Sequence, residues 1–466
     1  MKWELLVPPK HSETTIQGTI GTEGNDYEAI ICSALFRRLQ DKAQVFPLDE
    51  DDYVRTRLTH SLEVSAIGKK LGEYVFRKLK TQQRDPWFRA RNEKAFSDVL
   101  LCAGLVHDIG NPPFGHFGEY AIREWFQNHL DQLKLGQQHV RQLLTPWQIQ
   151  DLLSFEGNAQ SLRLLSGTPY LGEYKGFDLS LGVLGAIMKY PVSSQDMLTG
   201  NARGFRKIGY NYAEQELYRT IDGQMELNGN RHPLSYLLEA ADDIAYRTSD
   251  MEDAVVKKVI SFQQISELFQ QYQAPAEEKM KYDADACHCM HKLSELYREE
   301  VSKGDCKAEF TAIQRWNRYV QSLMIEDAGL SFVRNYDAIM DGTFRGDLFD
   351  DTFSGYLIAA ISDMSEKLIY SSSIKTRPEL FGRKVIHSLL DQFMPAAIVY
   401  DTQEPMTFIE RRTIDTVSSF YKSMYRKQAA GKSQQEKLYL RILMITDFIS
   451  GMTDNYAKRL YQQLNV

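Results

Sequence analysis

Apolar residues recur at helical spacing along most of the chain. In residues 49–79, a period of about 3.6 residues relates Leu58, Leu62, Ala66, Leu71, Val75 and Leu79. This pattern predicts a long amphipathic helix with His60 near its start. Similar patterns predict helices in the segments 29–39, 121–133, 152–167, 180–191 and 232–255, and again through the last third of the chain.

The most informative stretch is 97–119, which reads SDVLLCAGLVHDIGNPPFGHFGE. We expect a buried helix with Ser97 as its N-cap, ended by Gly110 and the two prolines that follow. His107 and Asp108 would then lie side by side at the end of this helix, and His116 would follow in a glycine-rich turn. The alternative is a helix C-terminus stabilised by a cationic His107, with His116 simply in solvent.

The pattern contains no run of alternating strands and no repeat of 20 to 50 residues. The Asn228-Gly229 pair leads toward a proline rather than into a second strand. We therefore expect an all-α fold with at most a small β-hairpin, formed as one large helical domain over residues 1–466. The segment 198–211 is basic and rich in glycine, and it could cover a phosphate group.

The composition indicates which partners and which cellular compartment to expect for the protein. The 466 residues carry a formal net charge of −7, so the overall charge gives no reason to expect non-specific nucleic-acid binding. This net charge does not argue against a local basic cleft. There is no signal-peptide pattern at the start and no apolar run of about 18 residues. The 5 cysteines are sparse and odd in number, which favours reduced thiols. We expect a soluble, cytoplasmic protein that is not inserted in a membrane.

Two groups of residues could bind a metal ion. Cys287, His288, Cys289, His291 and Cys306 lie in a helical stretch rather than on a turn, so a structural zinc is disfavoured there.

The second group contains His60, His107, Asp108 and one aspartate of the Ala-Asp-Asp run, which is Asp242 or Asp243. These imidazoles and carboxylates come from three predicted helices and suit Mg, Mn, Fe, Co, Ni or Zn with water in open positions. No GxSxG, Walker A or GxGxxG motif competes with this site.

At this point the sequence resembles a known family. The H…HD…D order resembles HD-domain phosphohydrolases, and longer strings resemble the deoxyguanosinetriphosphate triphosphohydrolase (dGTPase) family. In chain order these strings are FRRLQDKAQVFPL, RTRLTHSLEV, LVHDIGNPPFGHFGE, FEGNAQSLR, MKYP, AADDIAYRTSDMEDA and FISGMTDNYA, from residue 36 to residue 457. The stretch before Asn25 departs from the arginine-rich opening usual in that family, which leaves any oligomer contact or effector site there open.

The resemblance implies an all-α HD-domain fold, with a catalytic core over about 26–260 and a C-terminal part over about 261–466 that completes the nucleotide pocket. It implies hydrolysis of dGTP, or of several dNTPs, to the deoxynucleoside and inorganic triphosphate with a divalent metal ion. It also implies a homo-oligomer, with a hexamer as one form, and a nucleotide or single-stranded DNA as an effector.

Carried over residue by residue, the resemblance also assigns roles. The metal ligands become His60, His107, Asp108 and Asp242, since the family pattern D-x3-Y-x3-D fits Asp242, Tyr246 and Asp250 and leaves Asp243 as a neighbour. The catalytic histidine and its acidic partner become His116 and Glu119. Positions around the triphosphate and metal are Arg57, Asn158, Lys189, Lys207 and Tyr246; positions near the sugar are Gln44 and Asp250; the base pocket has Tyr370 and Glu379.

Two other functions stay open from the residues. One is an HD phosphohydrolase that acts on another nucleotide, which the lysines and the EGNAQ string disfavour. The other is a nucleotide-binding or nucleic-acid-binding regulator whose HD site is vestigial, which the intact set of histidines and carboxylates disfavours.

Overall fold

Helices form nearly all of the regular structure. The computed structural model describes residues 1–8, 26–49, 51–167, 179–271, 289 and 291–464. Within these residues the strands are β1 (Lys134–Leu135) and β2 (Gln138–His139), an antiparallel hairpin that pairs Lys134 with His139. The prediction of an all-α fold with at most a small hairpin is therefore confirmed.

The helices up to residue 256 range from single turns to α4 (Arg57–Thr81) and α13 (Pro233–Val256), which are the longest of them. In chain order, these helices are α1 (Trp3–Leu6), α2 (Asp26–Ile31), α3 (Ala34–Arg38), η1 (Leu39–Asp41), α4, η2 (Ala90–Asn92), α5 (Glu93–Val106), α6 (Gly115–His129), α7 (Val140–Leu143), α8 (Pro146–Leu153), α9 (Gly157–Gly167), α10 (Leu181–Ile187), α11 (Ser194–Thr199), η3 (Tyr212–Glu214), α12 (Gln215–Met225) and α13.

The helices that follow are on average longer. They are α14 (Phe262–Gln271), α16 (Ala308–Arg334), α17 (Tyr336–Met340), α18 (Phe353–Met364), the π-helical turn η4 (Ser365–Tyr370), α19 (Ser373–Val399), α20 (Phe408–Thr416), α21 (Ser419–Ala429), α22 (Gln434–Ser450) and α23 (Asp454–Leu464).

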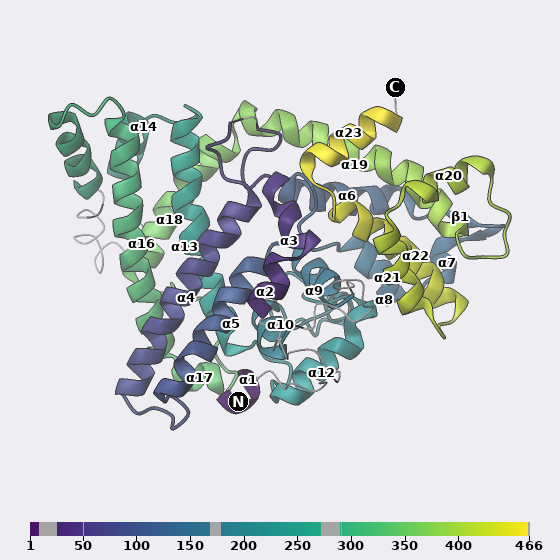
Figure 1. The fold of residues 1–466 in the computed structure, drawn as a ribbon, viewed down its shortest axis with the longest axis horizontal. Coiled ribbons are helices and arrows are strands. Elements are labelled where there is room, and N and C mark those ends of the chain that lie inside the picture. Colours follow the sequence, from purple (N-terminus) through teal and green to yellow (C-terminus); the bar gives the residue numbers. More distant parts are fainter. Residues whose placement is uncertain (9–25, 50, 168–178, 272–288, 290, 465–466) are drawn as a thin grey trace, which may run out of the picture.

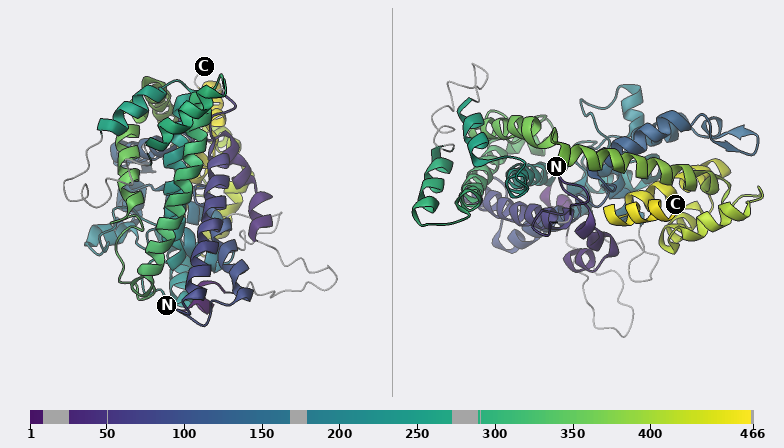
Figure 2. Two further views of the ribbon diagram at one scale, coloured as in Figure 1. Left: turned by 90° about the vertical axis from the view of Figure 1, so that its left-hand side faces the viewer. Right: turned by 90° about the horizontal axis from the view of Figure 1, so that it is seen from above.

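Two groups of helices meet in the molecule. In the first, α4 packs against α5, α13 and α16, and Figure 2 shows α4 and α16 side by side in its left view. In the second, the long helix α19 crosses the top of Figure 1 and contacts α6, α22 and α23. One hydrophobic cluster runs through both groups, from Trp3 to Leu460. The division into a catalytic core and a C-terminal part stays a prediction.

The helix that carries His107 differs from the prediction at its start. It begins at Glu93, so Ser97 lies inside α5 and not at its N-cap. The Ser97 hydroxyl donates to the Glu93 carbonyl at 2.9 Å, one turn earlier. A serine can satisfy its hydroxyl in this way within a helix. The first turn of α5 contains the charged residues Glu93 and Lys94 and the buried Phe96. Helix α6 likewise ends at His129, before the predicted end near residue 133.

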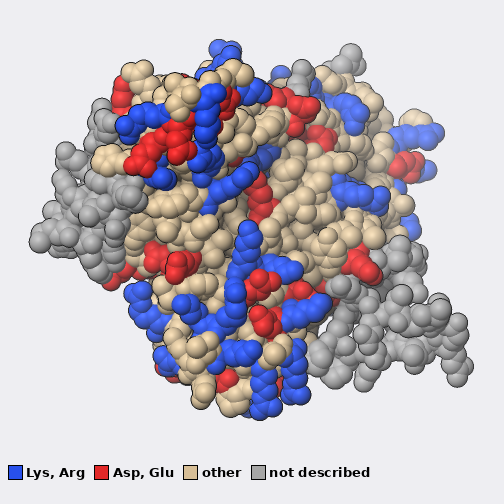
Figure 3. All heavy atoms as spheres, turned by 60° about the vertical axis from the view of Figure 1, so that its left-hand side comes forward, with Lys and Arg blue, Asp and Glu red and all other residues tan. Residues whose placement is uncertain are grey.

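The surface charge is uneven. Figure 3 shows Lys and Arg gathered in the lower part of one face. Where α4 ends and α5 begins, the exposed basic residues are Arg77, Lys80, Arg84, Arg89, Arg91 and Lys94. The negative net charge of the chain therefore lies on other parts of the molecule.

Two further sequence predictions concern what the chain binds or crosses. Among the described helices, none combines the length and the apolar character that a membrane crossing needs. Of the cysteine and histidine group considered for zinc, Cys287 and His288 lie outside the described residues.

Candidate active site

The predicted site residues converge on one cavity of about 530 Å³. It lies between the start of α4, the end of α5 and the middle of α13. All the predicted site residues except Glu119 line it: Gln44, Arg57, His60, His107, Asp108, His116, Asn158, Lys189, Lys207, Asp242, Tyr246, Asp250, Tyr370 and Glu379. Glu119 lies behind His116. The structure thus brings these residues together, while their roles stay predictions.

Local sequence explains how the two histidines reach the cavity. Thr56 forms a capping box with Thr59 and starts α4, which places His60 in its first turn. His107 is the C-cap of α5. The two helices approach closely because position 104 is glycine: a methyl group there would lie 2.6 Å from the Cα of Ser65. The pair of helices therefore fixes the two imidazoles at the floor of the cavity.

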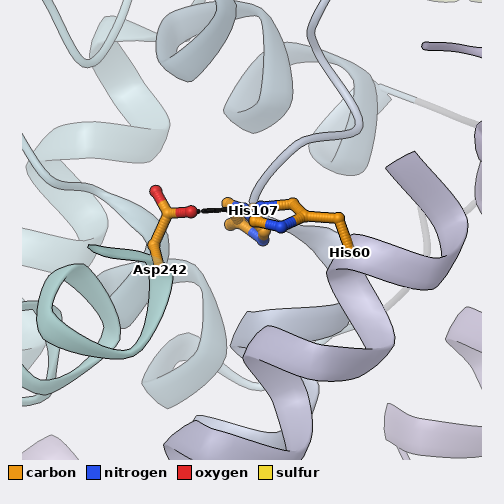
Figure 4. Close-up of side chains that lie close together, drawn as sticks. All are labelled: His60, His107 and Asp242. Atoms are coloured by element: carbon orange, nitrogen blue, oxygen red, sulfur yellow. Dashed lines mark hydrogen bonds and ion pairs between the residues drawn. The ribbon is translucent and has the colours of Figure 1, made fainter. Parts of the chain in front are cut away.

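His60, His107 and Asp242 form a cluster whose potential ligand atoms all lie within 4.8 Å of one another (Figure 4). Asp242 Oδ1 lies 3.1 Å from His60 Nε2 and 3.6 Å from His107 Nε2. His107 Nδ1 is 2.8 Å from the Gly104 carbonyl, while its Nε2 is buried and has no hydrogen-bond partner. A backbone carbonyl behind Nδ1 is the usual way to orient a metal-binding histidine. The donor set fits a divalent cation.

The electrostatics of the cluster support the same fit. Burial lowers the pKa of His107, but the carboxylates of Asp108 and Asp242 outweigh burial and raise that pKa to about 9. The floor of the cavity therefore favours a positive charge between these carboxylates. A bound divalent cation would take the place of the proton on His107 and neutralise the negative charge of Asp108 and Asp242.

Asp108 lies next to the cluster and turns toward other partners. Its Oδ2 accepts a hydrogen bond from Arg57 Nη1 at 2.5 Å, and its Oδ1 accepts one from Asn111 Nδ2 at 2.6 Å. Oδ1 is still only 3.6 Å from His107 Nε2. Burial would raise the pKa of Asp108, but Arg57 and the two histidines hold it well below its usual range. Asp108 is therefore an ionised carboxylate within reach of the cluster.

His116 and Glu119 form a pair on the first turn of α6. The His116 side chain is 74 % exposed, whereas that of Glu119 is 3 % exposed. His116 Nδ1 lies 3.4 Å from Glu119 Oε1, and the same oxygen accepts a hydrogen bond from the Gly157 backbone N–H at 3.3 Å. Burial raises the pKa of Glu119, but the interaction with His116 and nearby cations outweighs it, so the pKa lies below its ordinary value. A buried, ionised carboxylate thus lies next to a solvent-accessible imidazole.

The two predicted phosphate-binding lysines each face a glutamate. Lys189 Nζ lies 3.0 Å from Glu239 Oε1, and Glu239 Oε2 also pairs with Arg231 at 2.6 Å. Lys207 Nζ lies 3.5 Å from Glu156 Oε1, which also accepts a hydrogen bond from Asn158 Nδ2 at 2.7 Å. These carboxylates hold the cations in the cavity wall.

The other end of the cavity contains an aromatic and acidic group. The Tyr370 hydroxyl donates to Asp250 Oδ2 at 2.6 Å, while Asp250 Oδ1 is buried with no hydrogen-bond partner. Burial raises the pKa of Asp250 to about 7. Lys375 donates to Glu379 Oε1 at 2.6 Å and lies over the Tyr370 ring, 5.1 Å from its centre. Gln44 Oε1 is also buried without a partner.

Sequence reasoning missed Glu239 and Lys375. Glu239 precedes Asp242 by three positions on α13, so helical spacing alone places both on one face. Lys375 precedes Glu379 by four positions on α19, which is the spacing of a helical ion pair. Asp243 also lines the cavity, lies 3.5 Å from Arg247, and is not part of the cluster of His60, His107 and Asp242; its assignment as a neighbour of the metal ligands stays a prediction.

Comparisons with known proteins agree with this geometry. The HD domain family model matches residues 57–159, a segment that includes His60, His107, Asp108 and His116. The deoxyguanosinetriphosphate triphosphohydrolase-like protein of Listeria monocytogenes is 41 % identical and aligns over 100 % of this chain and 99 % of its own length.

More distant relatives carry related names. The probable deoxyguanosinetriphosphate triphosphohydrolase of Pseudomonas aeruginosa is 30 % identical over 97 % of this chain and 94 % of its own. The deoxyguanosinetriphosphate triphosphohydrolase of Klebsiella pneumoniae is 32 % identical over 94 % of this chain and 93 % of its own. With an HD domain and this similarity along the whole chain, the protein belongs to the deoxyguanosinetriphosphate triphosphohydrolase family.

Proposed function

We propose that this protein is a metal-dependent hydrolase that converts dGTP, and further dNTPs, to the deoxynucleoside and inorganic triphosphate. One observation carries the proposal. A single cavity holds a cluster suited to a divalent cation, two lysines, and a histidine backed by a buried carboxylate. These are the groups that cleavage of a phosphate ester needs. The names of the relatives point to dGTP.

His60, His107 and Asp242 would hold the cation, and Asp108 would complete the set because its Oδ1 is already 3.6 Å from His107 Nε2. The mixed histidine and carboxylate ligands suit Mg, Mn, Fe, Co, Ni or Zn, and the choice among them stays open. When bound, such an ion neutralises charge on a phosphoryl oxygen and makes water a better nucleophile.

The protein's own groups would handle the leaving oxygen. Water attacks the α-phosphorus and releases a proton to the solvent, a bond from the water oxygen to phosphorus forms, and the bond from phosphorus to O5′ breaks. The imidazole of His116 donates a proton to O5′ as the nucleoside leaves. Glu119 keeps the imidazole oriented, because its carboxylate is buried and ionised and its Oε1 lies 3.4 Å from His116 Nδ1.

The lysines would bind the triphosphate as it leaves. Lys189 and Lys207 line the cavity, and Arg57 adds a third cation to its lining. At the other end, the Glu379 carboxylate can accept from the N–H groups of guanine next to the Tyr370 ring, and Gln44 and Asp250 would face the sugar. The homo-oligomer and the effector implied by the resemblance stay predictions.

A product assay tests the proposal. The wild-type protein is incubated with each of the four dNTPs and each divalent metal ion, and the products are separated by anion exchange and identified by ³¹P NMR. Inorganic triphosphate is the expected product. Pyrophosphate or phosphate would indicate a different phosphohydrolase, and no turnover would indicate a binding protein. The His139→Ala variant changes a histidine in the β-hairpin, outside the cavity, and serves as a matched control for histidine substitutions.

A further inference from the structure

The loop before His116 contains an unusual backbone conformation. Phe114 has φ 66° and ψ 16°, a left-handed conformation that bulky residues rarely adopt. It is 3 % exposed and lies two residues before His116. A conformation of this kind persists only where the surrounding structure holds it in place. The contacts that hold Phe114 therefore also set the position of His116.

The backbone of Phe114 is held by an aspartate from the far end of the chain. Asp454, the first residue of α23, is 2 % exposed. Its Oδ1 accepts a hydrogen bond from the Phe114 N–H at 2.9 Å, and its Oδ2 accepts one from the Ala43 N–H at 3.1 Å. Ala43 directly precedes Gln44 on the cavity wall. One carboxylate thus joins two segments of the cavity that are far apart in sequence.

The ring of Phe114 is held by a different helix. Gly382 lies within α19, and a methyl group at this position would lie 2.4 Å from Phe114 Cγ. The ring therefore packs directly against the backbone of α19. The strained residue is fixed by α23 through its N–H and by α19 through its side chain.

Lys42 adds a second connection between the same elements. Its side chain is buried, and its Nζ donates to the Asn111 carbonyl at 2.6 Å and to the Ser450 carbonyl at 2.7 Å. Asn111 begins the loop that leads to Phe114, and Ser450 ends α22. The turn between α22 and α23 is thus connected to both ends of the loop before His116.

We propose that Asp454 is a positioning residue for the reaction, which acts by holding Phe114 and so keeps His116 at the leaving oxygen. This inference rests on the proposed function only in the role it gives to His116. It assigns the turn between α22 and α23 a task in catalysis although none of its residues lines the cavity. The carboxylate is needed because both of its oxygens accept a backbone N–H.

A graded pair of variants tests the proposal. Asp454→Asn keeps one acceptor oxygen and so can retain one of the two hydrogen bonds, and Asp454→Ala retains neither. We expect kcat for dGTP to fall stepwise, toward about 10²-fold in the alanine variant, because displacement of a catalytic group by about 1 Å has effects of this size. We expect KM and metal content to stay near wild type. Hydrogen exchange of the peptide 111–117 should speed up in the same order.

The matched control is Asp391→Asn. Asp391 lies on α19 and accepts a hydrogen bond from the Trp125 indole N–H of α6 at 2.7 Å, far from His116 along that helix. We expect this variant to keep wild-type kcat and wild-type exchange in residues 111–117, whatever its thermal stability. If Asp391→Asn and Asp454→Asn lower kcat equally, or if kcat stays at wild type when exchange speeds up, the positioning role is wrong.

A second variant protects the test against a folding defect. Gly382→Ala leaves Asp454 intact, favours the helical state of α19, and pushes on the ring of Phe114. A loss of kcat with unchanged KM supports the proposal, and full activity contradicts it. Failure of the proposed function appears differently, as absence of triphosphate from the wild-type protein. Hydrogen exchange of residues 111–117 does not require turnover, so it tests the hold on the loop in either case.

Discussion

Replacing Glu119 by glutamine should slow the reaction without changing its products. The change removes the negative charge behind His116 and keeps an oxygen that can accept from the Gly157 N–H. A hydrogen bond to a charged group contributes about 1.5 to 3 kcal/mol. At about 1.4 kcal/mol for each factor of ten, this corresponds to a loss in kcat of roughly 10- to 150-fold.

The geometry places the expected loss near the lower end of this range. The 3.4 Å separation between His116 Nδ1 and Glu119 Oε1 is longer than a strong charged hydrogen bond, and the imidazole is 74 % exposed to water. We therefore expect kcat to fall about 10-fold, with KM and metal content unchanged. Because the pKa of Glu119 lies below its ordinary value, the carboxylate is ionised at neutral pH, and acid removes its contribution only as pH falls through that lowered pKa.

The assay is steady-state turnover of dGTP with quantification of triphosphate. Glu124→Gln is the matched control, since Glu124 lies on the same helix and also faces a histidine, with His387 Nε2 at 3.2 Å. Its partners lie outside the cavity, so kcat should stay within about twofold of wild type. Wild-type kcat in Glu119→Gln would refute the orienting role, and a rise in KM alone would make Glu119 a residue of substrate binding.

Three other results are expected. His107→Ala should lose bound metal and turnover while circular dichroism still shows a folded helical protein, because the residue ends a helix at the cavity floor; full activity would remove the metal hypothesis. His116→Ala should bind metal and dGTP but lose about 10²- to 10⁴-fold in kcat, as measured against the His139→Ala control; a loss of affinity alone would contradict its role as an acid. Turnover in ¹⁸O-labelled water should place the label in triphosphate, and label in the nucleoside would show attack at C5′.

Local rules in the sequence place His60, His107 and Asp242 each on a predicted helix, but the choice of Asp242 over Asp243 came from the family resemblance. The apolar run before His107 predicts a buried helix that ends at a glycine and proline turn, and helical spacing places Asp242, Tyr246 and Asp250 on one face. The all-α class follows from the same periodicity. The predicted start of α5 at Ser97 was wrong, because the charged residues in the first turn of this helix have the composition of a loop.

The sequence could not predict contacts that depend on packing between distant segments. Asp454 belongs to a string that resembles the family, yet nothing near it in the chain indicates that its two oxygens accept from Ala43 and Phe114. The left-handed conformation of Phe114 is equally invisible, since its side chain gives no signal for positive φ. The contacts of Asp454 and Phe114 become apparent only in the folded structure, where the C-terminal helices pack against the loop before His116.

The pairing of charges in the cavity bears on which ligands it can accept. Each lysine or arginine that lines the cavity already forms an ion pair with a nearby carboxylate. The pairs are Arg57 with Asp108, Lys189 with Glu239, Lys207 with Glu156, and Lys375 with Glu379. A ligand must therefore compete with a carboxylate for each cation, and a group with a single negative charge has little to gain. A triphosphate offers several charged oxygens at once, so it can engage two lysines while its own hydrogen bonds replace those it displaces. The same ion pairs restrict the two lysine side chains, which lowers the entropy lost when a ligand binds. On this reasoning, we propose that Glu239 and Glu156 favour a triphosphate over a group with a single negative charge, although each would repel a phosphate by itself.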